Sequence, residues 1–191
     1  MIPKILEVVK AKGYEIFTEG DYNLNIIAMR KKDGKPDYFD DWICVAYKDR
    51  GLWQVERWPV TTDPGVYYLN HPSRRSGTAI VCPGQYKGYE IGFHKGRYEA
   101  LVQRGPIRVF RDANRDSVHD MDPDTVEEGF FGCNIHRSHP TGASGRVSKW
   151  SAGCTVFSHF RDFQRFMDIC KKQIEHHPRW TKFTYTLLEE E

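Results

Sequence analysis

The sequence predicts a β-rich α+β domain, built as a sandwich or an open barrel, with a short N-terminal helix and one longer helix near the C-terminus. Short stretches of β-branched and aromatic residues recur along the chain, and Gly, Pro and Asp turns separate them. Only two segments have helical spacing of apolar residues. The length of 191 residues, with 39% hydrophobic and 14% aromatic residues, suits one packed domain over residues 1–191.

The N-terminal half contains most of the predicted strands. A short helix over residues 3–12 comes first, because Pro3 suits a first helical turn and Gly13 suits a helix end. Turn residues such as Asp63-Pro64-Gly65 then divide the chain into strand-like pieces. We expect strands at residues 22–30, 42–47, 52–62, 66–69, 78–82, 98–103 and 107–110.

The longer helix is predicted directly after residue 157. Ser158 is a good N-cap residue, and Asp162 places a negative charge near the positive end of the helix. His177-Pro178 ends the helix, and residues 181–188 alternate like a final strand. One apolar stripe is expected to face the core, formed by Phe160, Phe163, Met167, Cys170 and Ile174.

Charge and hydropathy exclude several classes of protein. The net charge of +2, from 28 basic and 26 acidic residues, gives no strong field to attract nucleic acid. No stretch approaches the roughly 20 apolar residues of a membrane span, so no membrane insertion is expected. Glu7, Lys10 and Lys12 interrupt the N-terminal segment, and we expect no signal peptide. The five cysteines form no disulfide framework.

The most informative pair of residues is Cys154 and His136. Cys154 follows a small-residue turn, and His136 lies 18 positions earlier on an expected strand. An imidazole can take the proton of a thiol, which then attacks a carbonyl carbon. The backbone N–H groups of Gly153 and Cys154 are candidate oxyanion donors, and the Ser151 hydroxyl can orient the turn. This chemistry needs Cys154 and His136 to meet in a groove open to solvent.

The spacing of these residues resembles a known catalytic signature. His136 followed, after 14 residues, by Ser151-Ala152-Gly153-Cys154 is similar to the motif of the L,D-transpeptidase (YkuD-type) catalytic domain. Residues 53–67, with a Thr-ended strand before a Pro-Gly turn, also look like a segment of that family. The resemblance covers about residues 40–160. It departs from the family at Ala152, Val156 and Arg137, where His, Arg and Gly are usual.

The resemblance implies a cysteine enzyme that acts on peptidoglycan stem peptides through a thioester acyl-enzyme. Cys154 is then the nucleophile, His136 the base, and Ser151 and Gly153 shape the oxyanion turn. We expect Trp150 and Arg137 to contact the substrate. No cofactor or metal is required. The divergent motif favours hydrolysis, as an endolysin-like L,D-carboxypeptidase or endopeptidase, over cross-linking or exchange. Such a protein would be made in the cytoplasm and delivered to the cell wall or periplasm by another system.

Two metal-binding alternatives remain open. Cys133, His136, His139 and Cys154 could hold zinc, although the spacing is not that of a standard structural site. Asp112, Asn114, Asp116 and Asp120 resemble part of a calcium loop, but Ser117 occupies the usual Gly position and Pro123 the usual Glu position. We expect a polar turn there.

Other functional classes also remain open. The domain could be a cell-wall-binding module without catalysis. A papain-like or NlpC/P60-type cysteine peptidase is less consistent, because its Cys precedes its His in the chain. His94 could line the cleft, although a surface hairpin histidine is expected. Trp42, Trp53 and Trp58 are expected to lie in the core. Neither the bond cleaved nor the oligomeric state follows from the sequence.

Overall fold

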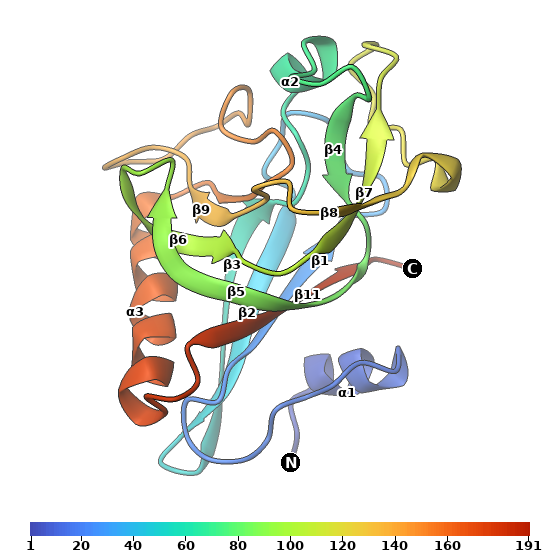
Figure 1. Cartoon of the computed structure of the whole chain (residues 1–191). Helices are drawn as coiled ribbons and strands as arrows, with labels where there is room; N and C mark the ends of the chain where they lie inside the picture. Colours follow the sequence, from blue (N-terminus) through green and yellow to red (C-terminus); the bar gives the residue numbers. More distant parts are fainter.

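The computed structural model describes all residues 1–191 and contains a closed barrel of eight strands (Figure 1). The predicted β-rich α+β class is confirmed, and the barrel is closed rather than open. Closure leaves no unpaired strand edge in this sheet. Around the barrel the strands follow the order β1 (Asn25–Arg30), β11 (Lys182–Glu189), β5 (Gly84–His94), β6 (Tyr98–Gln103), β9 (Ile135–Arg137), β10 (Thr155–Phe157), β3 (Leu52–Thr61) and β2 (Asp41–Asp49).

Two of the barrel contacts are parallel, and one of them joins the first strand of the chain to the last. β1 pairs with β11, and β9 pairs with β10. The remaining contacts are antiparallel, and the narrowest is the single residue pair of Leu101 with Ile135 between β6 and β9. The short strands β9 and β10 therefore lie between the longer strands β6 and β3.

A second sheet of three strands lies at the end of the molecule opposite the N-terminal helix (Figure 1). It consists of β4 (Thr78–Val81), β7 (Ile107–Asp112) and β8 (Glu127–Gly129), with a 3₁₀ turn at Pro123–Thr125. The main chain at Ala79, in β4, contacts the turn before β10 at Gly153. This small sheet therefore supports the Cys154 turn from outside the barrel.

The two helices predicted from periodicity are both present. α1 (Lys4–Ala11) buries Leu6 and Val9 against the outer face of β1 and β2. α3 (Phe160–His176) runs along the barrel (Figure 1) and buries Phe163, Met167 and Cys170, as predicted. Its buried face also contains Phe166, Ile169 and Gln173, and it is therefore wider than the predicted stripe.

The predicted N-cap of α3 is wrong by one residue. His159 occupies that position, and its Nδ1 accepts a hydrogen bond from Arg161 N at 3.2 Å. The Ser158 carbonyl instead accepts from Ser144 N and from the Ser138 hydroxyl. Ser158 is therefore tied to the loop after β9, and the helix begins only after it.

The strand predicted at residues 66–69 is also wrong. These residues form α2 (Val66–Asn70), a short helix whose first hydrogen bond runs from Tyr68 N to Gly65 O at 2.9 Å. Gly65 is held in place because its N–H donates to Ser151 O at 2.9 Å. No strand lies beside this segment to pair with it, so the backbone satisfies its own hydrogen bonds in a helical turn.

The interior and the surface both agree with the balanced composition. The barrel and α3 enclose one large core, which includes Trp58, Tyr89, Phe157 and Tyr185. Trp42 and Trp53 are only half buried, which corrects the expectation that they lie in the core.

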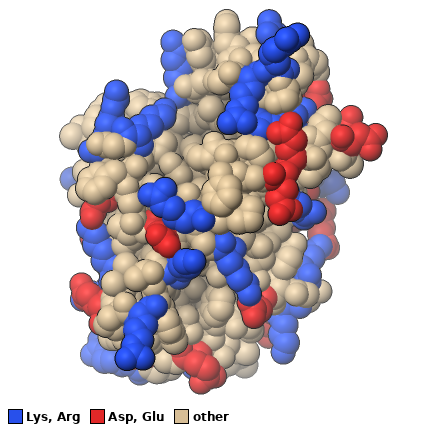
Figure 2. Space-filling model, in the orientation of Figure 1, with Lys and Arg blue, Asp and Glu red and all other residues tan.

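Figure 2 shows basic and acidic side chains interspersed over one face, with no extended surface of a single sign. None of the helices has the length and apolar composition needed to cross a membrane.

Candidate active site

His136 and Cys154 come from neighbouring parallel strands. In the register of β9 and β10, Ile135 pairs with Thr155 and His136 pairs with Val156. Thr155 N also donates to Asn134 O at 3.0 Å, so the register extends to the residues just before each strand. Alternate residues of a strand share a face. The alternation therefore directs Asn134, His136, Cys154 and Val156 to one face of the strand pair.

The hydrogen bonds of His136 determine which ring nitrogen carries the proton. Its Nδ1 lies 2.7 Å from Arg137 O and 3.1 Å from the Tyr98 hydroxyl. A carbonyl oxygen only accepts, so Nδ1–H donates to Arg137 O, and the Tyr98 hydroxyl donates to the same oxygen at 3.2 Å. Nε2 then carries the lone pair, and it is buried without a hydrogen-bond partner. The imidazole therefore presents a free base.

A second imidazole lies against the first. His94 ends β5 and stacks on His136, with ring centroids 3.9 Å apart. Asn134 orients His94, because Asn134 Oδ1 accepts from Gln103 N and its amide nitrogen lies 3.0 Å from His94 Nδ1. His94 is 6% exposed, so the expectation of a surface hairpin histidine is wrong.

The Cys154 thiol contacts main-chain atoms of the segment before β9. Its sulfur accepts from Asn134 N at 3.4 Å and lies 3.5 Å from Gly132 O, to which the thiol donates. No hydrogen bond joins the sulfur to His136. The thiol proton is therefore directed at Gly132 O and not at Nε2 in this arrangement.

The turn before Cys154 is organised by Ser151, as predicted. The Ser151 hydroxyl donates to Cys154 O at 2.8 Å and accepts from Gly153 N at 3.2 Å. This bond occupies the Gly153 N–H, which corrects its predicted role as an oxyanion donor. The N–H of Cys154 donates to no acceptor of the protein. Cys154 N–H is thus the available donor beside the sulfur.

Burial controls the protonation of the pair. Cys154 is 9% exposed and His136 is 2% exposed, so the expectation of a groove open to solvent is wrong. Burial raises the pKa of the Cys154 thiol to about 11. Burial, followed by the neighbouring His94, lowers the pKa of His136 to about 3. Both groups are neutral in the resting site at physiological pH.

The two residues predicted to contact substrate lie in different surroundings. The Arg137 guanidinium is 3.9 Å above the ring of Tyr98, which in turn contacts His136. Trp150 is 38% exposed on the loop between β9 and β10, and its indole N–H donates to the Ser144 hydroxyl. Arg137 is therefore close to the imidazole, whereas Trp150 forms part of the outer surface.

The metal-binding alternatives find no support in the geometry. No group of three or more His, Cys, Asp or Glu side chains is arranged to hold a metal ion. His139 Nδ1 accepts from Thr141 N and Gly142 N, which uses the lone pair that zinc would need. In the segment that resembles part of a calcium loop, Asn114 bonds to Asp116 and Asp120, as in the polar turn that the sequence predicts.

Sequence reasoning missed Tyr98 and Asn134, which lie near His136, and named His94 only as a possible residue of the cleft. Tyr98 and His94 lie on β6 and β5, and Asn134 precedes β9. The strand β5 was not predicted, since its residues Gly84–His94 include three glycines and lack regular alternation. The one available signal was the polar pair Asn134 and His136 at a two-residue spacing, which directs both side chains to one face.

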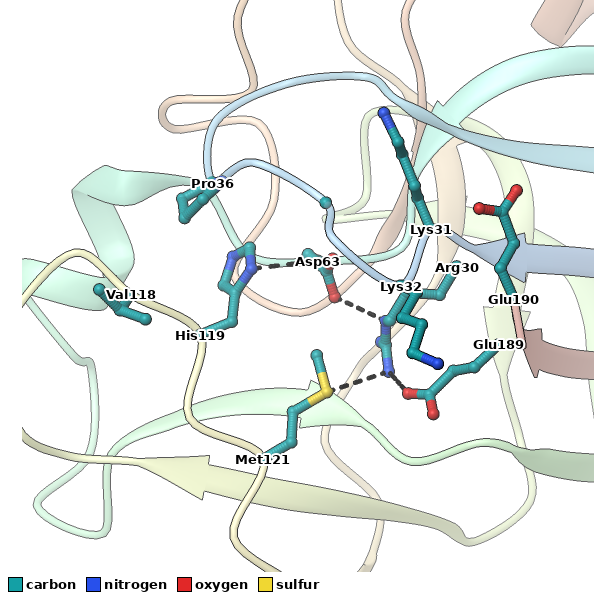
Figure 3. A pocket seen from close by; sticks show the side chains of 11 residues that line it. Arg30, Lys31, Lys32, Pro36, Asp63, Val118, His119, Met121, Glu189 and Glu190 are labelled. Carbon is teal, nitrogen blue, oxygen red and sulfur yellow. Dashed lines mark hydrogen bonds and ion pairs between the residues drawn. The ribbon is translucent and has the colours of Figure 1, made fainter.

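Residues around a polar cavity of about 490 Å³ form contacts that connect the barrel to the Cys154 turn (Figure 3). In it, buried Arg30 pairs with Asp63 at 2.9 Å and with Glu189 at 3.3 Å, and His119 Nε2 donates to Pro64 O. These contacts tie β1 and β11 to the segment after β3. The same segment reaches the Cys154 turn through Gly65 N.

We expect acid to destabilise the fold through His136. The unfolded chain binds a proton at this histidine below its ordinary pKa of 6.5, whereas the folded chain does so only near its folded pKa of about 3. The stability from neutral burial is present above pH 6.5 and is lost progressively as the pH falls towards 3, by about 5 kcal/mol in total. Urea unfolding of wild type and His136→Phe at pH 7, 5.5 and 4.5 measures this pH-dependent loss of stability. His71→Phe, at an exposed histidine, is the control. Equal pH dependence in wild type and His136→Phe would contradict the assignment.

Gly153→Ala is expected to destabilise the protein by about 3 kcal/mol or more. Gly153 has a φ of +116°, and an added Cβ would lie 2.5 Å from Ala79 O. Both the backbone angle and the main-chain contact oppose the substitution. Gly145→Ala is the matched control, because nothing lies within 4 Å of its Cβ position and its φ is not positive. Thermal unfolding compares the two, and a similar loss in both variants would refute the steric argument.

No protein-family model, no curated protein and no solved structure matches this chain.

Proposed function

We propose that this protein is a cysteine acyl-transfer enzyme that hydrolyses stem peptides of peptidoglycan, as the L,D-transpeptidase-like motif implies. The observation that carries the proposal is the free Nε2 of His136, a buried base without a partner on the same strand-pair face as Cys154. Buried polar atoms are rarely left unpaired, and a catalytic role is one explanation for an exception. The unpaired Cys154 N–H supplies the complementary oxyanion donor.

The proposed reaction has two balanced steps. The Cys154 sulfur attacks the peptide carbonyl carbon while its proton moves to His136 Nε2, and Cys154 N–H stabilises the oxyanion. The C–N bond breaks, the amine takes the proton from Nε2, and a thioester remains. Water then attacks the thioester, with Nε2 accepting its proton and returning it to the sulfur.

The pKa values constrain how the first step proceeds. Moving a proton from a thiol of pKa about 11 to an imidazole of pKa about 3 costs on the order of 10 kcal/mol in the empty site. A stable thiolate–imidazolium pair is therefore absent before substrate binds. Proton transfer has to accompany carbon–sulfur bond formation, when the developing oxyanion is stabilised.

Nearby cations favour an anionic substrate. The Lys95 ammonium lowers the pKa of both Cys154 and His136, after the larger effects of burial on each. Arg137 lies beside Tyr98. Stem peptides carry free carboxylates, which such groups attract.

The burial of the thiol and the imidazole favours a second candidate, a cell-wall-binding module without catalysis. Mass spectrometry of muropeptides incubated with the protein separates the two. Hydrolysis adds the mass of water at the cleaved bond, exchange replaces the terminal residue, and a binding module leaves every mass unchanged. Unchanged muropeptides, together with retention of the protein on sacculi, would replace the enzyme proposal with the binding proposal.

A further inference from the structure

A small cavity with a cationic lining borders the turn that presents Cys154. Its volume is about 170 Å³, and the residues around it belong to β4, β7 and the segments near them. Ala152 lines this cavity two residues before the thiol. Ala79 lines it as well, and its carbonyl lies close to Gly153. The cavity therefore borders the Cys154 turn at Ala152, and Ala79 contacts that turn from β4.

The charged residues that line the cavity are both basic, and Glu127, outside the lining, pairs with one of them. Arg111 and Arg74 are its two charged lining residues, and no Asp or Glu lines it. The Arg74 guanidinium forms no ion pair, whereas several other exposed basic side chains do. The Ser73 hydroxyl, also in the lining, is a further polar group. This lining suits an anion and disfavours a cation.

The Arg111 guanidinium has one nitrogen that lacks a hydrogen-bond acceptor. Its side chain is only 6% exposed. Nε bonds to Glu127 at 2.9 Å, Nη1 bonds to Gly77 O at 3.3 Å, and the guanidinium stacks on Phe131. Nη2 is buried and has no hydrogen-bond partner. A guanidinium fixed on two sides with a donor left over is well arranged for an oxygen anion.

We propose that this cavity binds a free carboxylate of the peptide that Cys154 attacks, so that the enzyme selects peptides with a carboxylate close to the scissile bond. The inference rests on the proposed function of Cys154 and specifies its substrate class. Arg111 Nη2 and Arg74 bind the carboxylate oxygens. The volume accommodates a carboxylate with a small side chain and is too small for a sugar unit. The occupant that the proposal assigns to the cavity is the C-terminal carboxylate of the stem peptide, so that the activity is that of a carboxypeptidase.

The test compares two synthetic tetrapeptide stems that contain meso-diaminopimelate and differ only at the C-terminus, a carboxylate in one and an amide in the other. We expect kcat/KM to be at least tenfold lower for the amide. Arg74→Gln and Arg111→Lys should raise KM for the carboxylate peptide about tenfold and leave the amide unaffected. Arg75→Gln is the control, because Arg75 is exposed beside Arg74 and does not line the cavity.

The outcomes separate this inference from the proposed reaction. Equal cleavage of both peptides by wild type, or unchanged selectivity in the variants, would overturn the carboxylate site and leave the reaction standing. If neither peptide is cleaved, the reaction fails, and titration calorimetry with the Cys154→Ala protein still tests the cavity. At least tenfold tighter binding of the carboxylate peptide supports the site, and equal or absent binding refutes it. If Arg111→Lys does not fold, exposed Arg74→Gln remains as the test.

Discussion

Alanine in place of Cys154 is expected to abolish cleavage of peptidoglycan peptides, with kcat reduced by more than about 1000-fold. No other thiol is expected to replace it. Cys133 lies close to Cys154, but its side chain belongs to the buried core and burial raises the pKa of its thiol, whereas Cys44, Cys82 and Cys170 lie in other segments. The fold should survive. The Cys154 sulfur makes only long contacts, at 3.4 and 3.5 Å, and their loss costs about 1 kcal/mol. Muropeptide mass spectrometry measures the activity, and thermal unfolding measures the stability.

Cys170→Ala is the matched control for this experiment. Cys170 lies on α3 and is fully buried, so its truncation should destabilise the protein by about 1–2 kcal/mol and preserve kcat per folded molecule. Intact-protein mass spectrometry adds a direct readout, since wild type incubated with substrate should carry an acyl group that Cys154→Ala lacks. Cleavage by Cys154→Ala at the wild-type rate would end the enzyme proposal.

His136→Asn is expected to lower kcat/KM by about 100- to 10,000-fold. The Asn amide can still donate to Arg137 O in place of Nδ1, but it removes the Nε2 base. The pH profile of wild type provides a second signature. Because the pKa of His136 is lowered to about 3, the neutral base persists through pH 5, and kcat/KM should not fall near pH 6.5 as it would for an exposed histidine.

His139→Asn serves as the control, because His139 lies in the loop after β9 and bonds only to neighbouring backbone N–H groups. It should retain wild-type kcat/KM. A loss in His139→Asn equal to that in His136→Asn would point to a general loss of structure. An acid limb near pH 6.5 in wild type would show that His136 is more exposed in solution than its 2% exposure implies.

Local sequence patterns were sufficient for elements whose partners are close in the chain. The apolar stripe of α3 and the turn residues that bound β3 depend on neighbours a few positions away, and both elements formed as predicted. The Ser151 hydroxyl organises the Cys154 turn for the same reason, because its partners are two and three residues distant. These features follow from spacing alone.

The predictions failed where distant segments decide the outcome. Residues 66–69 have the composition of a strand, but Gly65 is held by Ser151 and no strand edge is available, so they form α2. His94 has the sequence context of a hairpin tip, yet it stacks on a ring 42 positions later and is buried. The strand or helix propensity of a residue carries no information about such contacts, because they exist only once β5, β6 and β9 are adjacent.

The sequence by itself determined the β-rich class, the short N-terminal helix, the longer helix near the C-terminus, and the presence of a thiol and an imidazole at a spacing similar to a catalytic motif. Only the tertiary structure decided which atoms of these two residues are free. The lone pair at His136 Nε2 follows from a carbonyl that engages Nδ1, and the neutral state of both groups follows from burial. Tautomer and pKa depend on the surrounding dielectric and on hydrogen-bond partners, and packing in three dimensions sets both.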